Sequence, residues 1–271
     1  MKLLEVRGLK VGVDGREILH GVDIGVGAGE TVVLLGVNGA GKSTLAGAVM
    51  GVIGGREVVV QREVGGEEER EGAGSAREVE VRGEVVFEGK NIEGMEMDAR
   101  ARAGIFMSWQ APVEVPGVTM TELLWTAIEE RAGKGVSRRE VEEKIARGIS
   151  ELKLEAFSAG REVNVGASGG ERKAFEVLQM MVLGPKLAIL DEIDSGLDVD
   201  AARRVSGVVA KWQRETGAGL LIISHNMRIL EKLVVDRVYI LDDGRIVKVG
   251  GRELMAMVMK EGFKGGARRK T

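Results

Sequence analysis

One glycine-rich stretch sets the expectations for the rest of the chain: Gly36-Val37-Asn38-Gly39-Ala40-Gly41-Lys42-Ser43-Thr44. It follows the apolar run 31–35, which is typical of a buried strand, and precedes the helix-compatible residues 45–50. Glycines let backbone N–H groups approach a phosphate chain, and the dipole of the following helix favours its negative charge. The strand, loop and helix order therefore predicts a phosphate-binding loop rather than a glycine-rich turn that ends in Lys-Ser by chance.

Two side chains at the end of this stretch carry the expected chemistry. The pattern G-x-x-x-x-G-K-[ST] places Lys42 to reach the β- and γ-phosphates and the Ser43 hydroxyl to ligate Mg²⁺. We therefore expect residues 36–44 to bind ATP, with Mg²⁺ as the cofactor and Lys42 also serving catalysis.

Composition excludes several other classes of protein. The chain has 271 residues, enough for one large α/β domain with an inserted subdomain. Its net charge of −3 provides no basic field for a nucleic-acid partner, and the absence of cysteine excludes thiolate ligands for an iron–sulfur cluster. No apolar run approaches the ~20 residues that span a bilayer, and the start lacks a signal-peptide pattern. We expect a cytoplasmic protein without direct membrane insertion.

Apolar patterns predict an α/β fold with an antiparallel β edge and an inserted helical subdomain. Short extended runs within residues 3–35 form the edge and lead into the phosphate-loop strand, and residues 56–84 are interpreted as an extended hairpin insertion. The patterns of residues 119–184 are helical. There Thr119, Ser137 and Ser168 each precede a Glu by three residues, which predicts three capping boxes.

The predicted organisation is a single domain over residues 1–271. Residues 1–110 and 185–271 are expected to form the α/β core with its antiparallel β subdomain, and residues 111–184 the helical subdomain. Beyond Pro185 the patterns predict a strand at 186–190, a helix at 199–216, a strand at 220–224, a helix at 227–234, a hairpin turning at 242–244 and a helix at 252–260.

Two carboxylates follow the predicted strand 186–190. Open α/β sheets bind ligands at the C-terminal ends of their strands, where Asp191 and Glu192 are placed. We expect Asp191 to hold Mg²⁺ through water and Glu192 to polarise the water that attacks the γ-phosphate.

A second decisive stretch is Ser168-Gly169-Gly170-Glu171, which we call the signature turn. Its pattern is that of a well-capped helix start, and this alone explains it as a local structural device. Exposed N–H groups at such a start also form an anion site. We expect the γ-phosphate held by a second subunit to fill it.

Two further residues follow predicted strands. His225 comes after the run 220–224 and is expected to contact the γ-phosphate, with a structural histidine as the alternative. Gln110 comes after the extended run 105–109 and is expected to contact Mg²⁺ and the attacking water.

The order of these motifs resembles that of the ATPase subunits of the ATP-binding cassette (ABC) superfamily, over nearly the whole chain. The motifs are the phosphate loop, Gln110, Ser168-Gly169-Gly170, Asp191-Glu192, Ser195-Gly196-Leu197-Asp198 and His225. The resemblance implies an ABC-type fold with a RecA-like parallel core. It also implies an ATP-dependent homodimer, in which each phosphate loop faces the other copy's signature turn and Asp198 couples the two sites.

Longer stretches narrow this resemblance to the SufC family, the ABC ATPases of iron–sulfur cluster assembly. They are residues 105–118, 168–173 and 191–198, and Glu171 stands where most ABC transporter ATPases carry Gln. The resemblance implies the scaffold proteins SufB and SufD as partners, docking near residues 110–118. Trp109 and Trp125 are candidates for that contact, with core packing as the alternative.

Two departures from the family pattern are the longer segment 56–82 and Ala167, which replaces a bulkier apolar residue. Two other functions remain open. One is the nucleotide-binding subunit of an ABC membrane transporter, which uses the same ATP chemistry. The other is a regulatory ATPase that holds DNA or ribosomes, which the lack of a basic field disfavours.

Overall fold

A computed structural model describes residues 2–53, 78–109, 112–133, 135–154, 157, 160–224 and 227–262. Gln110 and His225 lie outside the described residues, as does most of the insertion predicted at 56–84.

The predicted antiparallel β edge is confirmed as a separate sheet of four strands in the order β2-β1-β4-β5. Its strands are β1 (Lys2–Val13), β2 (Arg16–Gly27), β4 (Val79–Phe87) and β5 (Lys90–Asn91). The turn between β1 and β2 places Asp14 and Gly15 at positive φ, as two-residue hairpins require. The sequence indicated a break before Val85, but residues 79–87 form one strand, because they pair with β1 from Leu4 to Val13 across one register shift.

The second sheet has six strands in the order β12-β11-β3-β10-β9-β6, and its central strands are parallel. They are β3 (Thr31–Leu35), β6 (Ile105–Met107), β9 (Leu187–Asp191), β10 (Gly219–Ile223), β11 (Arg237–Asp242) and β12 (Arg245–Gly250). Every residue of β3, β9 and β10 is buried. Because parallel strands end at one edge of the sheet, the phosphate loop after β3 and Asp191 at the end of β9 share that edge.

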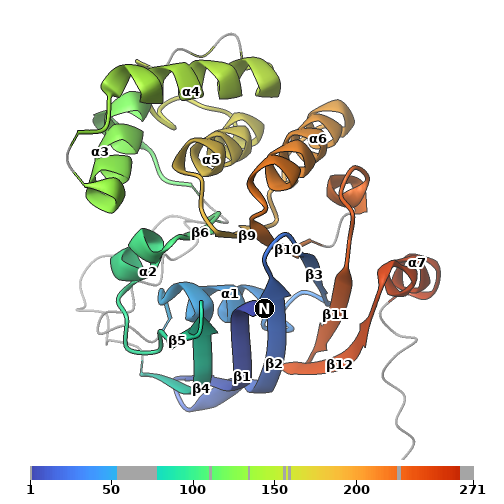
Figure 1. The fold of residues 1–271 in the computed structure, drawn as a ribbon. Helices are drawn as coiled ribbons and strands as arrows, with labels where there is room; N and C mark the ends of the chain where they lie inside the picture. The colour runs from blue at the N-terminus through green and yellow to red at the C-terminus, as the bar shows by residue number, and fades with distance from the viewer. Residues whose placement is uncertain are drawn as a thin grey trace, which may run out of the picture.

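Helices cover one face of this sheet, and the antiparallel sheet with α1 covers the other (Figure 1). The helices are α1 (Lys42–Met50), α2 (Met97–Ala103), α3 (Met120–Ala132), α4 (Arg138–Leu152), α5 (Gly169–Leu183), α6 (Val199–Thr216) and α7 (Arg252–Glu261). Alternate strand residues enter two separate cores. Leu190 packs on the side of the long helices, whereas Ile189 packs on the side of α1 and the antiparallel sheet.

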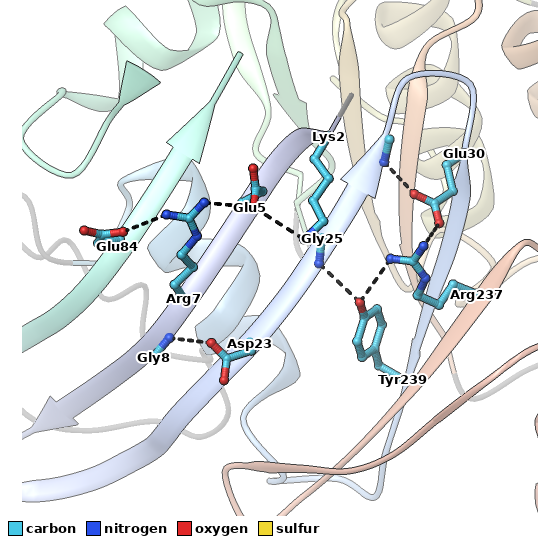
Figure 2. A network of polar contacts seen from close by, with 11 residues as sticks. Lys2, Glu5, Arg7, Gly8, Asp23, Gly25, Glu30, Glu84, Arg237 and Tyr239 are labelled. Atoms are coloured by element: carbon cyan, nitrogen blue, oxygen red, sulfur yellow. Dashed lines mark hydrogen bonds and ion pairs between the residues drawn. The ribbon is translucent and has the colours of Figure 1, made fainter. Parts of the chain in front are cut away.

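A polar network ties the two sheets together (Figure 2). The Arg237 guanidinium of β11 lies 2.9 Å from the Glu30 carboxylate, which also accepts the Gly27 N–H at 2.6 Å. The Tyr239 hydroxyl accepts the Gly25 N–H at 3.3 Å. Two residues of β11 therefore hold the end of β2 against the central sheet.

Three local predictions were wrong or incomplete. An α-helix was predicted at 227–234, but the structure has only the 3₁₀ turn η1 (Met227–Leu230) there. Ser137 begins α4 without a side-chain capping hydrogen bond. The small sheet of β7 (Val115–Thr119) and β8 (Glu162–Val163) was missed, since Pro116 and Gly117 are poor strand formers.

None of the helices in the described part of the chain is long and apolar enough to cross a membrane.

Candidate nucleotide-binding site

The phosphate loop connects the end of β3 to the first turn of α1, as predicted. Val37, Asn38 and Gly39 are exposed, whereas the residues on either side of them are buried. Gly41 has φ +100°, and a Cβ there would lie 2.7 Å from a methyl carbon of Leu19. A side chain at this position would therefore collide with β2 and strain the backbone, which explains the glycine.

Lys42 is held inside the loop. Its ammonium group donates to the carbonyl oxygens of Gly36 and Val37, each at 3.0 Å. Burial lowers the pKa of Lys42, while Glu192 and Asp191 oppose that change. The two carboxylates are therefore close enough to Lys42 for their charges to act on it.

Asp191 and Ser43, each predicted from the sequence to hold Mg²⁺, meet at the edge of the sheet. Burial raises the pKa of Asp191, and a hydrogen bond from the Ser43 side chain opposes this shift. Asp191 is only 4% exposed, and its Oδ1 atom has no hydrogen-bond partner among the described residues. A buried carboxylate oxygen without a partner beside a hydroxyl is a fitting ligand pair for Mg²⁺.

Glu192 turns the chain away from β9. Its φ of +50° is unusual for a residue with a side chain, and its N–H donates to the Ile223 carbonyl at 2.9 Å. This hydrogen bond to the neighbouring strand β10 holds the left-handed conformation in place. Such backbone strain is concentrated at functional sites.

The signature turn forms the capping box that the sequence predicted. Ser168 N–H and Oγ each lie 2.8 Å from Glu171 Oε2, and Glu171 N–H donates back to Ser168 Oγ at 3.3 Å. The hydrogen bond from the Ser168 backbone lowers the pKa of Glu171. Ser168 and Gly169 are exposed, so the start of α5 is accessible to a second molecule.

Asp198 begins α6. Its carboxylate accepts the Ala201 N–H at 2.7 Å, which makes it the N-cap of that helix. Gly196, at the tip of the preceding loop, packs against the signature turn. A Cβ added at Gly170 would lie only 3.2 Å from the Gly196 carbonyl oxygen. The starts of α5 and α6 are therefore neighbours.

Sequence reasoning missed three residues beside this site. Asp191 N–H donates to Ser108 Oγ at 2.8 Å, and Lys173 and Glu176 of α5 form a buried ion pair at 3.1 Å. A Lys and a Glu three positions apart on a helix are typical of an exposed surface, so the sequence held no signal of their burial.

Comparison with known proteins identifies the family. The family model described as ABC transporter matches residues 19–195. A probable ABC transporter ATP-binding protein of Streptococcus pyogenes serotype M3 is 37% identical over 269 residues, 98% of this chain and 95% of the relative. The chain belongs to the ABC transporter family. This cassette is also 36% identical, over 97% of its length and 93% of the relative, to a probable ATP-dependent transporter, ycf16, of Cyanophora paradoxa.

The fold of the cassette agrees with this assignment. A solved structure described as the ATP binding subunit of an ABC transporter superposes with a TM-score of 0.72 at 24% identity, covering 98% of this chain and 95% of that one. The predicted α/β cassette fold is confirmed. The cassette is an ATPase that binds ATP and uses Mg²⁺ for hydrolysis.

Proposed function

We propose that the cassette is a SufC-type ATPase, which closes as a homodimer on ATP and drives a conformational change in the scaffold proteins SufB and SufD. The observation that carries the catalytic part of this proposal is the hydrogen bond between the Ser43 and Asp191 side chains, beside a buried Asp191 Oδ1 that has no partner among the described residues. That contact joins the phosphate loop to the end of β9, where the attacking water must be activated.

Each residue of the site has an assigned role in this proposal. Ser43, Asp191 and Gln110 would hold Mg²⁺, which would supply neutralisation of the phosphate charge. Lys42 binds the β- and γ-phosphates, Glu192 polarises the attacking water, and His225 contacts the γ-phosphate. The reaction depends on positioning and charge neutralisation, with no covalent step on the protein.

The dimer follows from the signature turn. Ser168 and Gly169 are exposed at the capped start of α5, where backbone N–H groups and the helix dipole favour an anion. A second copy brings the γ-phosphate of its own ATP to this turn. Asp198 couples the two sites, because it caps α6 beside the signature turn.

We also propose the domain division expected from the sequence. Residues 1–110 and 185–271 make the α/β core and residues 111–184 the helical subdomain, within one domain over residues 1–271. The predicted compartment is the cytoplasm.

The scaffold contact is proposed at residues 110–118. Trp109, just before this segment, and Val113, within it, are 43% and 53% exposed, so two large apolar side chains are accessible there. Trp125 is assigned to internal packing instead, since it is partly buried and its Nε1 donates to the Val136 carbonyl at 3.1 Å. The close similarity of residues 105–118 to SufC supports a soluble scaffold as the partner.

The second candidate is the nucleotide-binding subunit of a membrane transporter, which the names of the relatives favour. Native purification of the tagged protein separates the two. Soluble SufB and SufD in stoichiometric amount support the first proposal, whereas an integral membrane permease contradicts it.

The role of Glu192 is tested by Glu192→Gln. We expect hydrolysis to fall by at least about a hundredfold, because the general base is lost, while ATP holds the variant as a dimer. Light scattering with and without ATP measures the dimer. Unchanged turnover without an ATP-stabilised dimer would show that Glu192 has been assigned wrongly.

A further inference from the structure

A buried ion pair on α5 has no role in the function proposed above. Lys173 Nζ and Glu176 Oε2 are 3.1 Å apart, and their side chains are only 5% and 4% exposed. Removing charges from water is costly, and a buried pair adds little net stability compared with apolar side chains of the same size. The pair therefore calls for an explanation other than stability.

This pair holds the main chain of Trp109. The Trp109 N–H donates to Glu176 Oε1 at 2.5 Å, and Lys173 Nζ donates to the Trp109 carbonyl oxygen. Strand β6 ends at Met107, so both backbone polar groups of Trp109 lie beyond its last residue. Two side chains from one helix satisfy them both.

The residue before Trp109 contacts the proposed metal ligand. Ser108 Oγ accepts the Asp191 N–H at 2.8 Å, and the Ser108 N–H donates to the Ile189 carbonyl at 2.9 Å. Lys173 and Glu176 also lie close enough to act electrostatically on Asp191. The chain of contacts thus runs from α5 through Trp109 and Ser108 to Asp191.

The same helix begins with the signature turn. The Arg172 N–H donates to the Ser168 carbonyl at 2.9 Å, and Arg172 also binds Glu114 at 2.5 Å. Side chains in the first two turns of α5 therefore bind Trp109 and Glu114, while the N-cap Ser168 is exposed. A rigid helix transmits a displacement of its first turn to the groups bound to the second.

We propose that Lys173 and Glu176 are positioning residues that couple the signature turn to Asp191 of the same subunit. Nucleotide held by a second copy at Ser168 then sets the position of the first copy's own metal-binding edge. This inference rests on the proposed ATP-dependent dimer.

Steady-state hydrolysis tests the positioning role. Lys173→Met removes the donor to Trp109, and the double variant Lys173→Met/Glu176→Gln removes both charges, so it avoids leaving one buried charge unpaired. We expect kcat to fall at least about tenfold in both variants, because the edge carrying Asp191 is displaced, while the dissociation constant for ATP stays within about twofold.

Lys211→Met/Glu151→Gln is the matched control, since it removes a partly exposed ion pair of 2.7 Å between α6 and α4, and should leave kcat unchanged. A folded double variant that dimerises on ATP and hydrolyses it at the parent rate would overturn the inference.

Trp109 itself reports the coupling. The chain has three tryptophans, so Trp125→Phe/Trp212→Phe leaves Trp109 as the single reporter. In a Glu192→Gln background we expect its emission to shift when ATP and Mg²⁺ produce the dimer. Adding Ser168→Arg should leave nucleotide binding but abolish both dimer and shift. Adding Lys173→Met/Glu176→Gln should leave the dimer but abolish the shift.

The outcomes separate the two proposals. A shift that persists in the dimer of the Lys173→Met/Glu176→Gln protein, or that accompanies nucleotide binding to the Ser168→Arg protein, contradicts the coupling alone. A dimeric parent protein without any shift also contradicts it. If light scattering shows no ATP-dependent dimer of the parent protein, the proposed function fails and the coupling fails with it.

Discussion

At the scale of single residues, burial distinguishes charged side chains that organise the cassette from those on its surface. Arg100, Lys173 and Glu176, counted as whole residues, are 4%, 4% and 3% exposed, although residues of these types lie mostly on protein surfaces. Sequence patterns predicted Lys42 and Asp191 because their motifs are local. They did not predict the other three, because the groups that satisfy a buried charge come from distant segments.

Arg100 of α2 illustrates the energetic consequence. Its guanidinium donates to the carbonyls of Ala48 and Val49 at the end of α1, both at 2.8 Å, and burial lowers its pKa. Arg100→Met leaves these carbonyls without that donor, so we expect the free energy of unfolding to fall by about 3 kcal/mol in urea titrations. Arg102→Met, which breaks only an exposed pair with Asp98, should cost less than about 0.5 kcal/mol. Equal losses in the two variants would contradict this account.

At the scale of elements, three identical capping patterns gave two capping boxes. Thr119 and Ser168 have ψ of 157° and 162° and form the box, whereas Ser137 has ψ of 121° and makes no capping bond. A rotation of the N-cap backbone moves its hydroxyl out of line with the first N–H groups. The sequence motif identifies where a helix starts, but the path of the incoming chain decides whether the box closes.

The box at the signature turn should make stability depend on pH. The hydrogen bond from the Ser168 N–H holds the pKa of Glu171 below its ordinary value in the folded protein. Because the folded value is lower than the unfolded one, the contribution is complete above the unfolded pKa and is lost as pH falls through the folded pKa. In urea unfolding near pH 7, we expect the free energy of unfolding of the parent protein to exceed that of Glu171→Gln by about 0.5 kcal/mol. This difference should be lost near pH 3.

Glu140→Gln is the matched control, because Ser137 makes no capping bond with its side chain. It should unfold like the parent protein at both pH values. An advantage over Glu171→Gln that grew towards low pH would contradict the assigned hydrogen bonds.

At the scale of the whole molecule, the proposed dimer requires each copy to present two incomplete sites. The phosphate loop and Asp191 lie at one edge of the six-stranded sheet, while Ser168 and Gly169 are exposed at the start of a helix that covers its face (Figure 1). The contacts of Arg237 and Tyr239 with the end of β2 fix the antiparallel sheet to the six-stranded sheet (Figure 2). Because the two sheets and helix α5 are in contact, closure of two copies would act on all three.

Specific activity should therefore rise with protein concentration, because hydrolysis in the proposed dimer needs two copies. Ser168→Arg should abolish hydrolysis while leaving the affinity for a fluorescent ATP analogue within about twofold, since a bulky cation replaces the exposed cap. Ser137→Arg is the control and should hydrolyse normally, because its hydroxyl caps nothing. Loss of nucleotide binding in Ser168→Arg, or constant specific activity at every dilution, would exclude a shared site.

The sequence by itself determined several of the elements and the position of the phosphate loop. It placed the helix at Val199–Thr216, the strand that ends in Asp191, and the phosphate loop between β3 and α1, because these depend on periodicity and on residues adjacent in the chain. Only the tertiary structure decided which elements meet: the contact of Ser43 with Asp191, the unbroken strand Val79–Phe87 and the hold of α5 on Trp109. Periodicity shows that a face is buried but not what buries it, since that partner comes from elsewhere in the chain and is selected by the packing of the whole molecule.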